Sequence, residues 1–131
     1  MTDAVLCRLK KILSAQPVES LDLPLSITAA VLLLIYLKGE DYYVHFQKRS
    51  QQVAIHRGEI CFPGGRKNST DNNLLSTALR ETSEESGISP ESVTVLGQLN
   101  DVQTITGYVL KVFVGTISST ASFKPNLAEV E

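Results

Sequence analysis

The longest apolar run in the chain covers residues 29–37, Ala-Ala-Val-Leu-Leu-Leu-Ile-Tyr-Leu. A short continuous run of this kind is typical of a strand that is buried on both faces, so it predicts the centre of a sheet. The run is too short to cross a bilayer as a helix, which takes about 20 residues. We therefore expect a buried central strand over residues 27–37.

A second strand is expected directly after the first. A Lys-Gly-Glu-Asp turn follows the apolar run, and residues 42–48 then have the pattern of the returning strand of a hairpin. Val44 and Phe46 alternate there with His45 and Gln47, so we expect the two polar residues on the wetter face of the hairpin.

The other elements interleave strands with helices. Residues 3–15 predict an amphipathic helix, because Val5, Leu6, Leu9, Ile12 and Leu13 share one stripe. Strands are expected at 59–62, 92–99 and 108–117, with a polar loop at 100–107. This order of elements predicts an α/β fold with a mixed sheet.

Composition places the chain among ordinary globular proteins of one domain. It has 131 residues, of which 43% are hydrophobic and 20% charged, and a formal net charge of −2. That balance gives no basic footprint for nucleic acid, and Cys7 and Cys61 form neither a disulfide framework nor a zinc pattern. We expect a cytoplasmic protein without nucleic-acid or membrane partners, divided into a helix and connector (1–24), a core (25–117) and a tail (118–131).

A glycine turn followed by a capped helix organises the middle of the chain. Pro63-Gly64-Gly65 is a cluster of turn residues, which forces the backbone to change direction. Asp71, Asn72 and Asn73 can each cap the start of a helix, and Gly87 can end it. The apolar stripe of the predicted helix consists of Leu74, Leu75, Ala78, Leu79 and Thr82.

Three glutamates on this helix carry the candidate chemistry. Glu81, Glu84 and Glu85 stand at i, i+3 and i+4, so they share one side of the helix, with Glu81 and Glu85 at the edge of the apolar stripe. A solvated acidic face is one interpretation. Because the three charges repel one another at the border of the core, the pattern also favours a divalent cation, and carboxylate oxygens suit Mg²⁺ or Mn²⁺.

The helix and the turn resemble the Nudix box. Its second half, Arg-Glu-(apolar)-x-Glu-Glu-x-Gly-(apolar), is similar to residues 80–88, and Gly65 resembles its leading glycine. Three departures stand out. The spacing from Gly65 to Arg80 is one residue longer than usual, Thr82 replaces an apolar residue, and the early glutamate of the box is missing, with Asp71 or Asn72 near its place.

The longer spacing is typical of the coenzyme A pyrophosphatase branch of this family. The pattern of that branch is similar to Arg49-Ser50, His56-x-Gly58, Phe62-Pro63-Gly64-Gly65 and Thr77-Ala78-Leu79-Arg80-Glu81. Ala54 and Asn68 depart from it, since the branch usually has Arg at the first of these positions and often Asp at the second. The resemblance implies a Nudix-like α/β/α sandwich with a mixed sheet.

The resemblance also implies roles for individual residues. Glu81, Glu84 and Glu85 would hold the metals, with the backbone carbonyl of Gly65 as a further ligand, and one glutamate would accept a proton from water. Arg80, one turn before Glu84, suits bracing a carboxylate as part of the catalytic set. Candidate substrate-binding residues are Arg49, His56, Arg66 and Lys67. Each of these four also suits an ordinary loop role, a backbone hydrogen bond for the histidine and solvated charge for the cations.

Two functions follow from the resemblance. The first is metal-dependent hydrolysis of a nucleoside diphosphate linked to another group, with coenzyme A, cleaved to 3′,5′-ADP and 4′-phosphopantetheine, as the leading substrate and ADP-ribose or a nucleoside triphosphate as alternatives. The second is a catalytically weak Nudix-fold binding or regulatory module, which the missing early glutamate favours.

The C-terminal part of the resemblance is short. A Nudix domain usually continues beyond the position matching residue 131, so we expect apolar surface to remain uncovered and a homodimer to form. The alternative is that residues 1–16 cover that surface within one chain. Glu129 resembles a late metal-binding carboxylate of the family, although its place near the end of the chain also suits a disordered tail.

Overall fold

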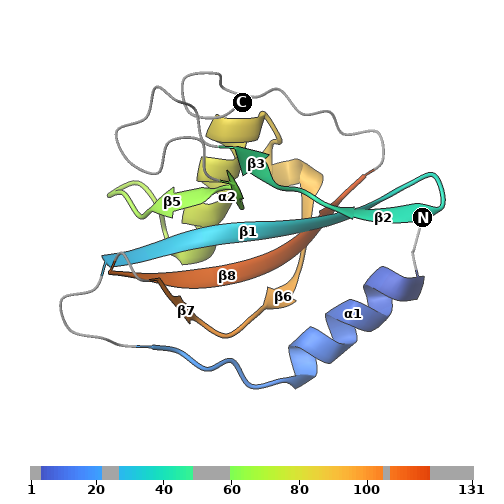
Figure 1. Ribbon diagram of the computed structural model, residues 1–131, viewed down its shortest axis with the longest axis horizontal. Helices are drawn as coiled ribbons and strands as arrows, with labels where there is room; N and C mark the ends of the chain where they lie inside the picture. The colour runs from blue at the N-terminus through green and yellow to red at the C-terminus, as the bar shows by residue number, and fades with distance from the viewer. Residues whose placement is uncertain (1–3, 22–26, 49–59, 105–106, 119–131) are drawn as a thin grey trace.

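The elements of the fold are taken from a computed structural model, which describes residues 4–21, 27–48, 60–104 and 107–118 (Figure 1). The helices are α1 (Ala4–Ala15), α2 (Leu74–Ser86) and a short 3₁₀ helix, η1 (Pro90–Ser92). The strands are β1 (Ile27–Lys38), β2 (Asp41–Val44), β3 (Gln47–Lys48), β4 (Ile60–Cys61), β5 (Gly64–Arg66), β6 (Val93–Gln98), β7 (Val102–Gln103) and β8 (Tyr108–Ile117). None of the described helices is long and apolar enough to span a membrane.

The apolar run forms β1, which lies inside the main sheet as predicted. Four strands of this sheet follow the order β2-β1-β8-β6, while β5 also pairs with β1 and β7 with β8. The β1–β8 pairing is parallel and the other pairings are antiparallel, so the sheet is mixed. The predicted α/β fold with a mixed sheet is confirmed.

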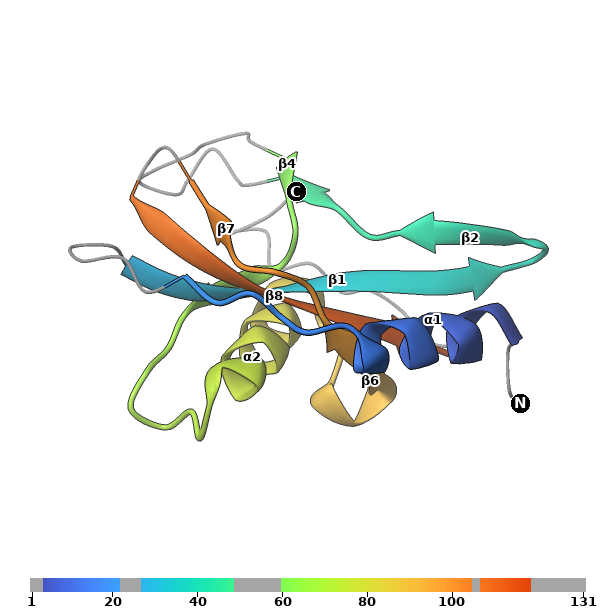
Figure 2. The same cartoon turned by 90° about the horizontal axis from the view of Figure 1, so that it is seen from below.

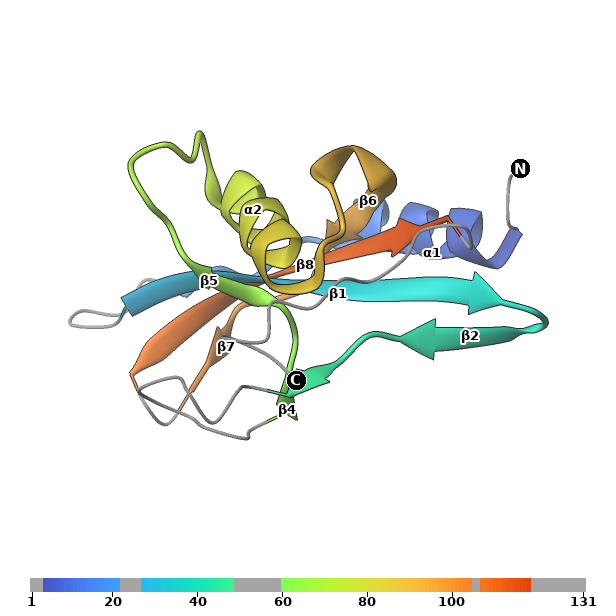
Figure 3. The same ribbon diagram turned by 90° about the horizontal axis from the view of Figure 1, so that it is seen from above.

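Alternate residues of β1 face two different helices. Leu32 and Leu34 are completely buried in a cluster with Ala78 of α2, whereas Leu33 packs into a second cluster with Leu13 of α1. The helix α2 therefore covers one face of the sheet (Figures 2 and 3), and α1 covers the other, alongside β6 (Figure 1). The second face is thus covered by α1 of the same chain over the length of that helix. This corresponds to the alternative to homodimer formation expected from the sequence, in which residues 1–16 cover the surface.

The returning strand of the predicted hairpin is broken in two. The strand β2 ends at Val44, and β3 belongs to a separate two-stranded sheet with β4. The prediction that the polar residues lie on the wetter face was wrong, because Val44 and Phe46 are exposed while Gln47 is only 6% exposed. The exposed Phe46 ring stacks on Phe62, with ring centroids 4.9 Å apart, which accounts for an aromatic residue on this side.

The glycine turn brings β5 against β1, a pairing that the sequence did not predict. A Cβ atom on Gly64 would lie 2.2 Å from the main-chain oxygen of Ala30, so only glycine permits this approach. The strand β7 likewise lies in the segment expected to be a loop. Cys7 and Cys61 are half-buried and are not joined in a disulfide.

Candidate active site

The helix α2 begins and ends where the sequence predicts. The side chain of Asn73 accepts a hydrogen bond from the main-chain N–H of Ser76 at 2.8 Å, which makes Asn73 the N-cap. At the other end Gly87 adopts a left-handed conformation, with φ of 78°, and its N–H donates to Ser83. These caps fix where the helix begins and ends, and so which of its turns carry the three glutamates.

Thr82, which replaces an apolar residue of the Nudix box, is completely buried without an unsatisfied hydroxyl group. Its Oγ1 donates to the carbonyl oxygen of Ala78 at 2.7 Å. Ser86 repeats the pattern one turn later, donating to the carbonyl of Thr82 at 2.6 Å. Because each hydroxyl bonds within its own helix, these small polar residues are accommodated in the core.

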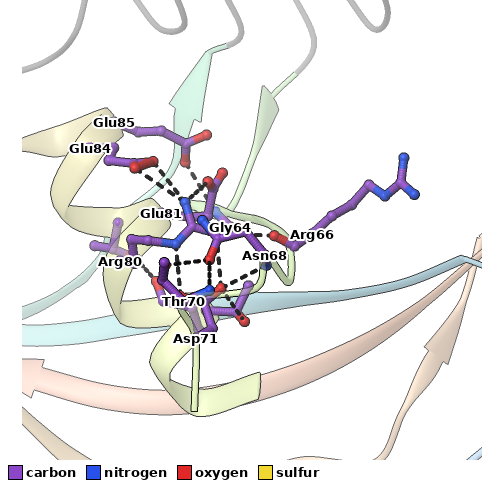
Figure 4. A network of polar contacts seen from close by, with 12 residues as sticks. Gly64, Arg66, Asn68, Thr70, Asp71, Arg80, Glu81, Glu84 and Glu85 are labelled. Atoms are coloured by element: carbon purple, nitrogen blue, oxygen red, sulfur yellow. Dashed lines mark hydrogen bonds and ion pairs between the residues drawn. The ribbon is translucent and has the colours of Figure 1, made fainter. Parts of the chain in front are cut away.

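Arg80 lies at the centre of the acidic face (Figure 4). Its Nη1 is 2.7 Å from Oε1 of Glu81 and 3.0 Å from Oε2 of Glu84. The predicted bracing of Glu84 by Arg80 is therefore present, and Glu81 is braced at the same time. One positive group thus compensates two carboxylates that would otherwise repel each other.

Asp71 anchors Arg80 from the loop before the helix. Its Oδ1 accepts from Nε of Arg80 at 2.9 Å and its Oδ2 from Nη2 at 3.1 Å, so the two planar groups meet through two parallel hydrogen bonds. Its Oδ2 also accepts from the N–H of Asn68 and from the hydroxyl of Thr77. The Arg80 guanidinium, with these further donors, holds the pKa of Asp71 well below its usual range.

The role of Asp71 was not predicted, although a signal was available. The sequence placed Asp71 near the missing early glutamate and among the candidate helix caps. In the structure Asn73 is the cap, and Asp71 is a nearly buried partner of Arg80, its side chain 4% exposed. The Asp71 carboxylate, near the position of the missing early glutamate, therefore forms an ion pair with Arg80, the arginine of the Nudix box.

Glu81 lies against the glycine turn. A Cβ atom on Gly65 would be 2.1 Å from Oε2 of Glu81, so the carboxylate occupies the space that any larger residue would need. Burial raises the pKa of Glu81, while the hydrogen bond from Arg80 acts in the opposite direction. The turn and this carboxylate form one tightly fitted unit.

Glu85 is buried, with 5% of its surface exposed, and its described contacts come from outside the helix. Its Oε1 accepts from the side-chain amide of Gln47 at 2.8 Å and from the main-chain N–H of Gly64 at 3.1 Å. Sequence reasoning did not single out Gln47. The only available signal was a polar residue inside an alternating strand, which was assigned to the wetter face.

The candidate substrate-binding residues lie only partly within the described segments. Arg66 and Lys67 are exposed, and the Arg66 side chain extends away from the carboxylates (Figure 4), while its carbonyl accepts from Nη2 of Arg80 at 3.1 Å. Arg49 and His56 lie outside the described residues, as do Ala54 and Glu129.

The donor set fits a divalent cation in its chemistry. Glu81 and Glu84 present carboxylate oxygens, the ligands that Mg²⁺ and Mn²⁺ prefer, around a positive group that already stands between them. The Glu81 carboxylate fits beside Gly65 only because this residue lacks a side chain. In this conformation no three His, Cys, Asp or Glu side chains of the described segments are gathered around one point.

Comparison with protein families identifies one domain. The NUDIX domain profile matches residues 26–128. A protein of Pectobacterium atrosepticum named uncharacterized Nudix hydrolase NudL is 41% identical over 83 residues, which cover 63% of this chain and 43% of that protein. The protein of the same name from Photorhabdus laumondii is 38% identical over 102 residues, or 78% of this chain and 54% of the relative. The chain spans about half the length of the curated relatives it matches.

Solved structures share the fold. A Nudix hydrolase from M. smegmatis, RenU, has a TM-score of 0.64 at 24% identity, covering 81% of this chain and 69% of that one. The NUDIX domain of Shewanella oneidensis NrtR, solved in complex with ADP ribose, has a TM-score of 0.65 at 19% identity, covering 100% of this chain and 80% of that one. With the profile matching most of the chain, these findings show that the chain belongs to the Nudix family.

Proposed function

We propose that this chain is a metal-dependent Nudix hydrolase that cleaves the diphosphate between a nucleoside and another group. The observation that supports this most is the convergence of Glu81 and Glu84 on a single positive group beside Gly65. Because Arg80 already holds both carboxylates in place, a divalent ion that binds them requires little reorganisation of either side chain.

Each residue of the site has a defined task in this proposal. A bound Mg²⁺ or Mn²⁺ supplies charge neutralisation for the phosphoryl groups and lowers the pKa of water. Glu81, Glu84 and Glu85 hold it, with the carbonyl of Gly65, and one of the glutamates accepts the proton of the attacking water. Arg80, anchored by Asp71, keeps the carboxylates oriented.

Coenzyme A is the proposed substrate, with 3′,5′-ADP and 4′-phosphopantetheine as products. The support is the spacing of residues 49–65 and the longer distance from Gly65 to Arg80, both typical of the coenzyme A branch. Coenzyme A carries an additional 3′-phosphate, which requires cations beyond those bound to the metal site. Arg49, Arg66 and Lys67 are the proposed donors, with His56 as a further contact.

ADP-ribose is the principal competing substrate, because the NrtR domain of similar fold was solved with that ligand. A substrate screen separates the possibilities. The chain is incubated with Mg²⁺ or Mn²⁺ and coenzyme A, dephospho-coenzyme A, ADP-ribose or nucleoside triphosphates, and the products are identified by mass. We expect coenzyme A to be cleaved most efficiently, and dephospho-coenzyme A less so. Preference for another substrate would refute the coenzyme A assignment while leaving hydrolysis in place.

Matched variants test the metal site itself. Glu84→Gln and Glu85→Gln each remove one charge without changing side-chain size, and we expect each to abolish most metal-dependent turnover with the fold retained. Glu40→Gln, which removes an exposed carboxylate in the turn between β1 and β2, serves as the control and should keep full activity. Wild-type turnover in both site variants at saturating Mg²⁺ would contradict the proposed site.

A binding module without significant catalysis is the second candidate. It is favoured by the missing early glutamate of the Nudix box, near whose place Asp71 is paired with Arg80. Such a module binds nucleotides in the presence of Mg²⁺ but releases them unchanged. Calorimetry with coenzyme A and ADP-ribose, combined with the product analysis above, distinguishes the two functions.

A further inference from the structure

Gln47 is a buried polar residue whose position is fixed from several sides. It is 6% exposed, and its backbone pairs with Cys61 in the β3–β4 sheet. The His45 Nε2 atom lies 3.4 Å from the Oε1 of Gln47, and the other end of the amide donates to Glu85. The Oε1 atom of Glu85 also accepts from the Gly64 N–H, so the amide presents its NH₂ group to Glu85 and its oxygen to His45.

This arrangement constrains Glu85 more closely than the helix alone can. A glutamate side chain rotates about three bonds, and a helix fixes only the direction in which it leaves the backbone. Here Gln47 and the Gly64 N–H both donate to the same oxygen, Oε1, which sets the plane and direction of the carboxylate. The two donors come from β3 and from the glycine turn, so three separate segments meet at this one group.

We propose that Gln47 is a positioning residue that orients the Glu85 carboxylate for binding a divalent cation. The inference rests on the proposed function, because it assigns Glu85 to the metal site. Gln47 itself touches neither metal nor substrate in this scheme and acts through the oxygen that it holds. A purely structural glutamine would satisfy its own amide and Glu85 in the core, without effect on metal affinity once the chain is folded.

The test compares the affinity for Mn²⁺ of folded variants, measured by electron paramagnetic resonance of the free ion. Gln47→Met keeps the length of the side chain and removes the donor. We expect it to weaken Mn²⁺ binding by about 10- to 100-fold, the usual range for partners of metal ligands. Gln103→Met makes the same replacement at an exposed residue of β7 and should change the affinity less than about twofold.

A double variant isolates the path of the effect. In a Glu85→Gln background the carboxylate is already lost, so Gln47→Met should weaken Mn²⁺ binding by less than about twofold further. Equal losses in both backgrounds would overturn the inference, because Gln47 would then act independently of Glu85. If Gln47→Met does not fold, Gln47→Asn shortens the side chain by one methylene, and its unchanged affinity would overturn the inference as well.

The outcomes separate this inference from the proposed function. A wild-type chain that binds no Mn²⁺ and cleaves no diphosphate refutes the function, and the inference with it. A wild-type chain that binds Mn²⁺ and cleaves its substrate, with unchanged affinity in a folded but less stable Gln47→Met variant, refutes the inference alone.

Discussion

The fit between Gly65 and Glu81 yields the sharpest stability prediction. Gly65 has no positive φ, so alanine can adopt its backbone conformation. The obstacle is instead the Glu81 side chain, whose Oε2 and Cδ would lie 2.1 and 2.6 Å from the new Cβ. Both distances are far shorter than ordinary van der Waals contact, so Gly65→Ala must displace the carboxylate.

The magnitude follows from two opposing effects. Overfilling a packed site costs about 1–3 kcal/mol, and the lower half of that range applies where the obstacle is the end of a flexible side chain. Replacing glycine by alanine at a compatible position stabilises by about 0.4–1 kcal/mol, since the unfolded chain loses freedom. We expect Gly65→Ala to destabilise the metal-free chain by up to about 1.6 kcal/mol. In a Glu81→Ala background the clash is absent, and the same change should be neutral or stabilising by about 0.4–1 kcal/mol.

Urea unfolding of the four chains, followed by circular dichroism in EDTA, measures both values. The difference between backgrounds gives the coupling between the two residues, which we expect to be about 1–2 kcal/mol, the cost of the clash alone. An equal effect of Gly65→Ala in both backgrounds would refute the reasoning, because it would mean that the Glu81 side chain is not the obstacle. Gly64→Ala, whose Cβ would meet the main chain of β1, should destabilise in either background.

Three further predictions concern neighbouring parts of the molecule. Burial raises the pKa of Glu81 above its usual 4.5, so its contribution to stability is present below that pH and is lost as the pH rises through the folded-state pKa. Thermal unfolding in EDTA should show that Glu81→Gln flattens this fall and that Glu40→Gln does not. Asp71→Ala releases Arg80 from its anchor and should lower kcat/KM at least about tenfold in the substrate assay. Leu13→Ala should cost about 2–5 kcal/mol in urea unfolding, and a smaller loss would contradict the packing of α1 on the sheet.

The long elements could be predicted because their signals are local. An unbroken apolar run defines β1, and the Asn73 side chain at the start and Gly87 at the end define α2. The short strands could not, because tertiary contact creates them. The clearest example is β5, which forms because Gly64 allows the chain to approach β1 closely, and no side chain in it signals a strand.

In the candidate site, too, the residues with a local signal could be predicted, and the residue placed by tertiary contact could not. The glutamates follow from their spacing on one helix, and so does the bracing of Glu84 by Arg80. Gln47 could not be found by spacing, because it lies 38 residues before Glu85 in the sequence. It also belongs to the small β3–β4 sheet, whereas Glu85 belongs to α2. The alternation of Gln47 with Phe46 predicts that Gln47 is exposed, but Gln47 is buried and Phe46 is exposed. The hydrogen bond from the Gln47 amide to the buried Glu85 outweighs the usual preference for an apolar interior.

The parallel pairing of β1 with β8 makes the folding of this chain a nonlocal event. Ile27 pairs with Tyr108 and Ile35 with Thr116, so each partner is separated by roughly 80 residues of chain. Contacts of such long range are slow to form, because the entropy of closing the loop must be lost before the pairing stabilises anything. During synthesis α1, β1 and α2 all leave the ribosome before β8, so the sheet on which both helices pack is incomplete until β8 is made. The acidic helix is thus synthesised before the sheet that supports it is complete.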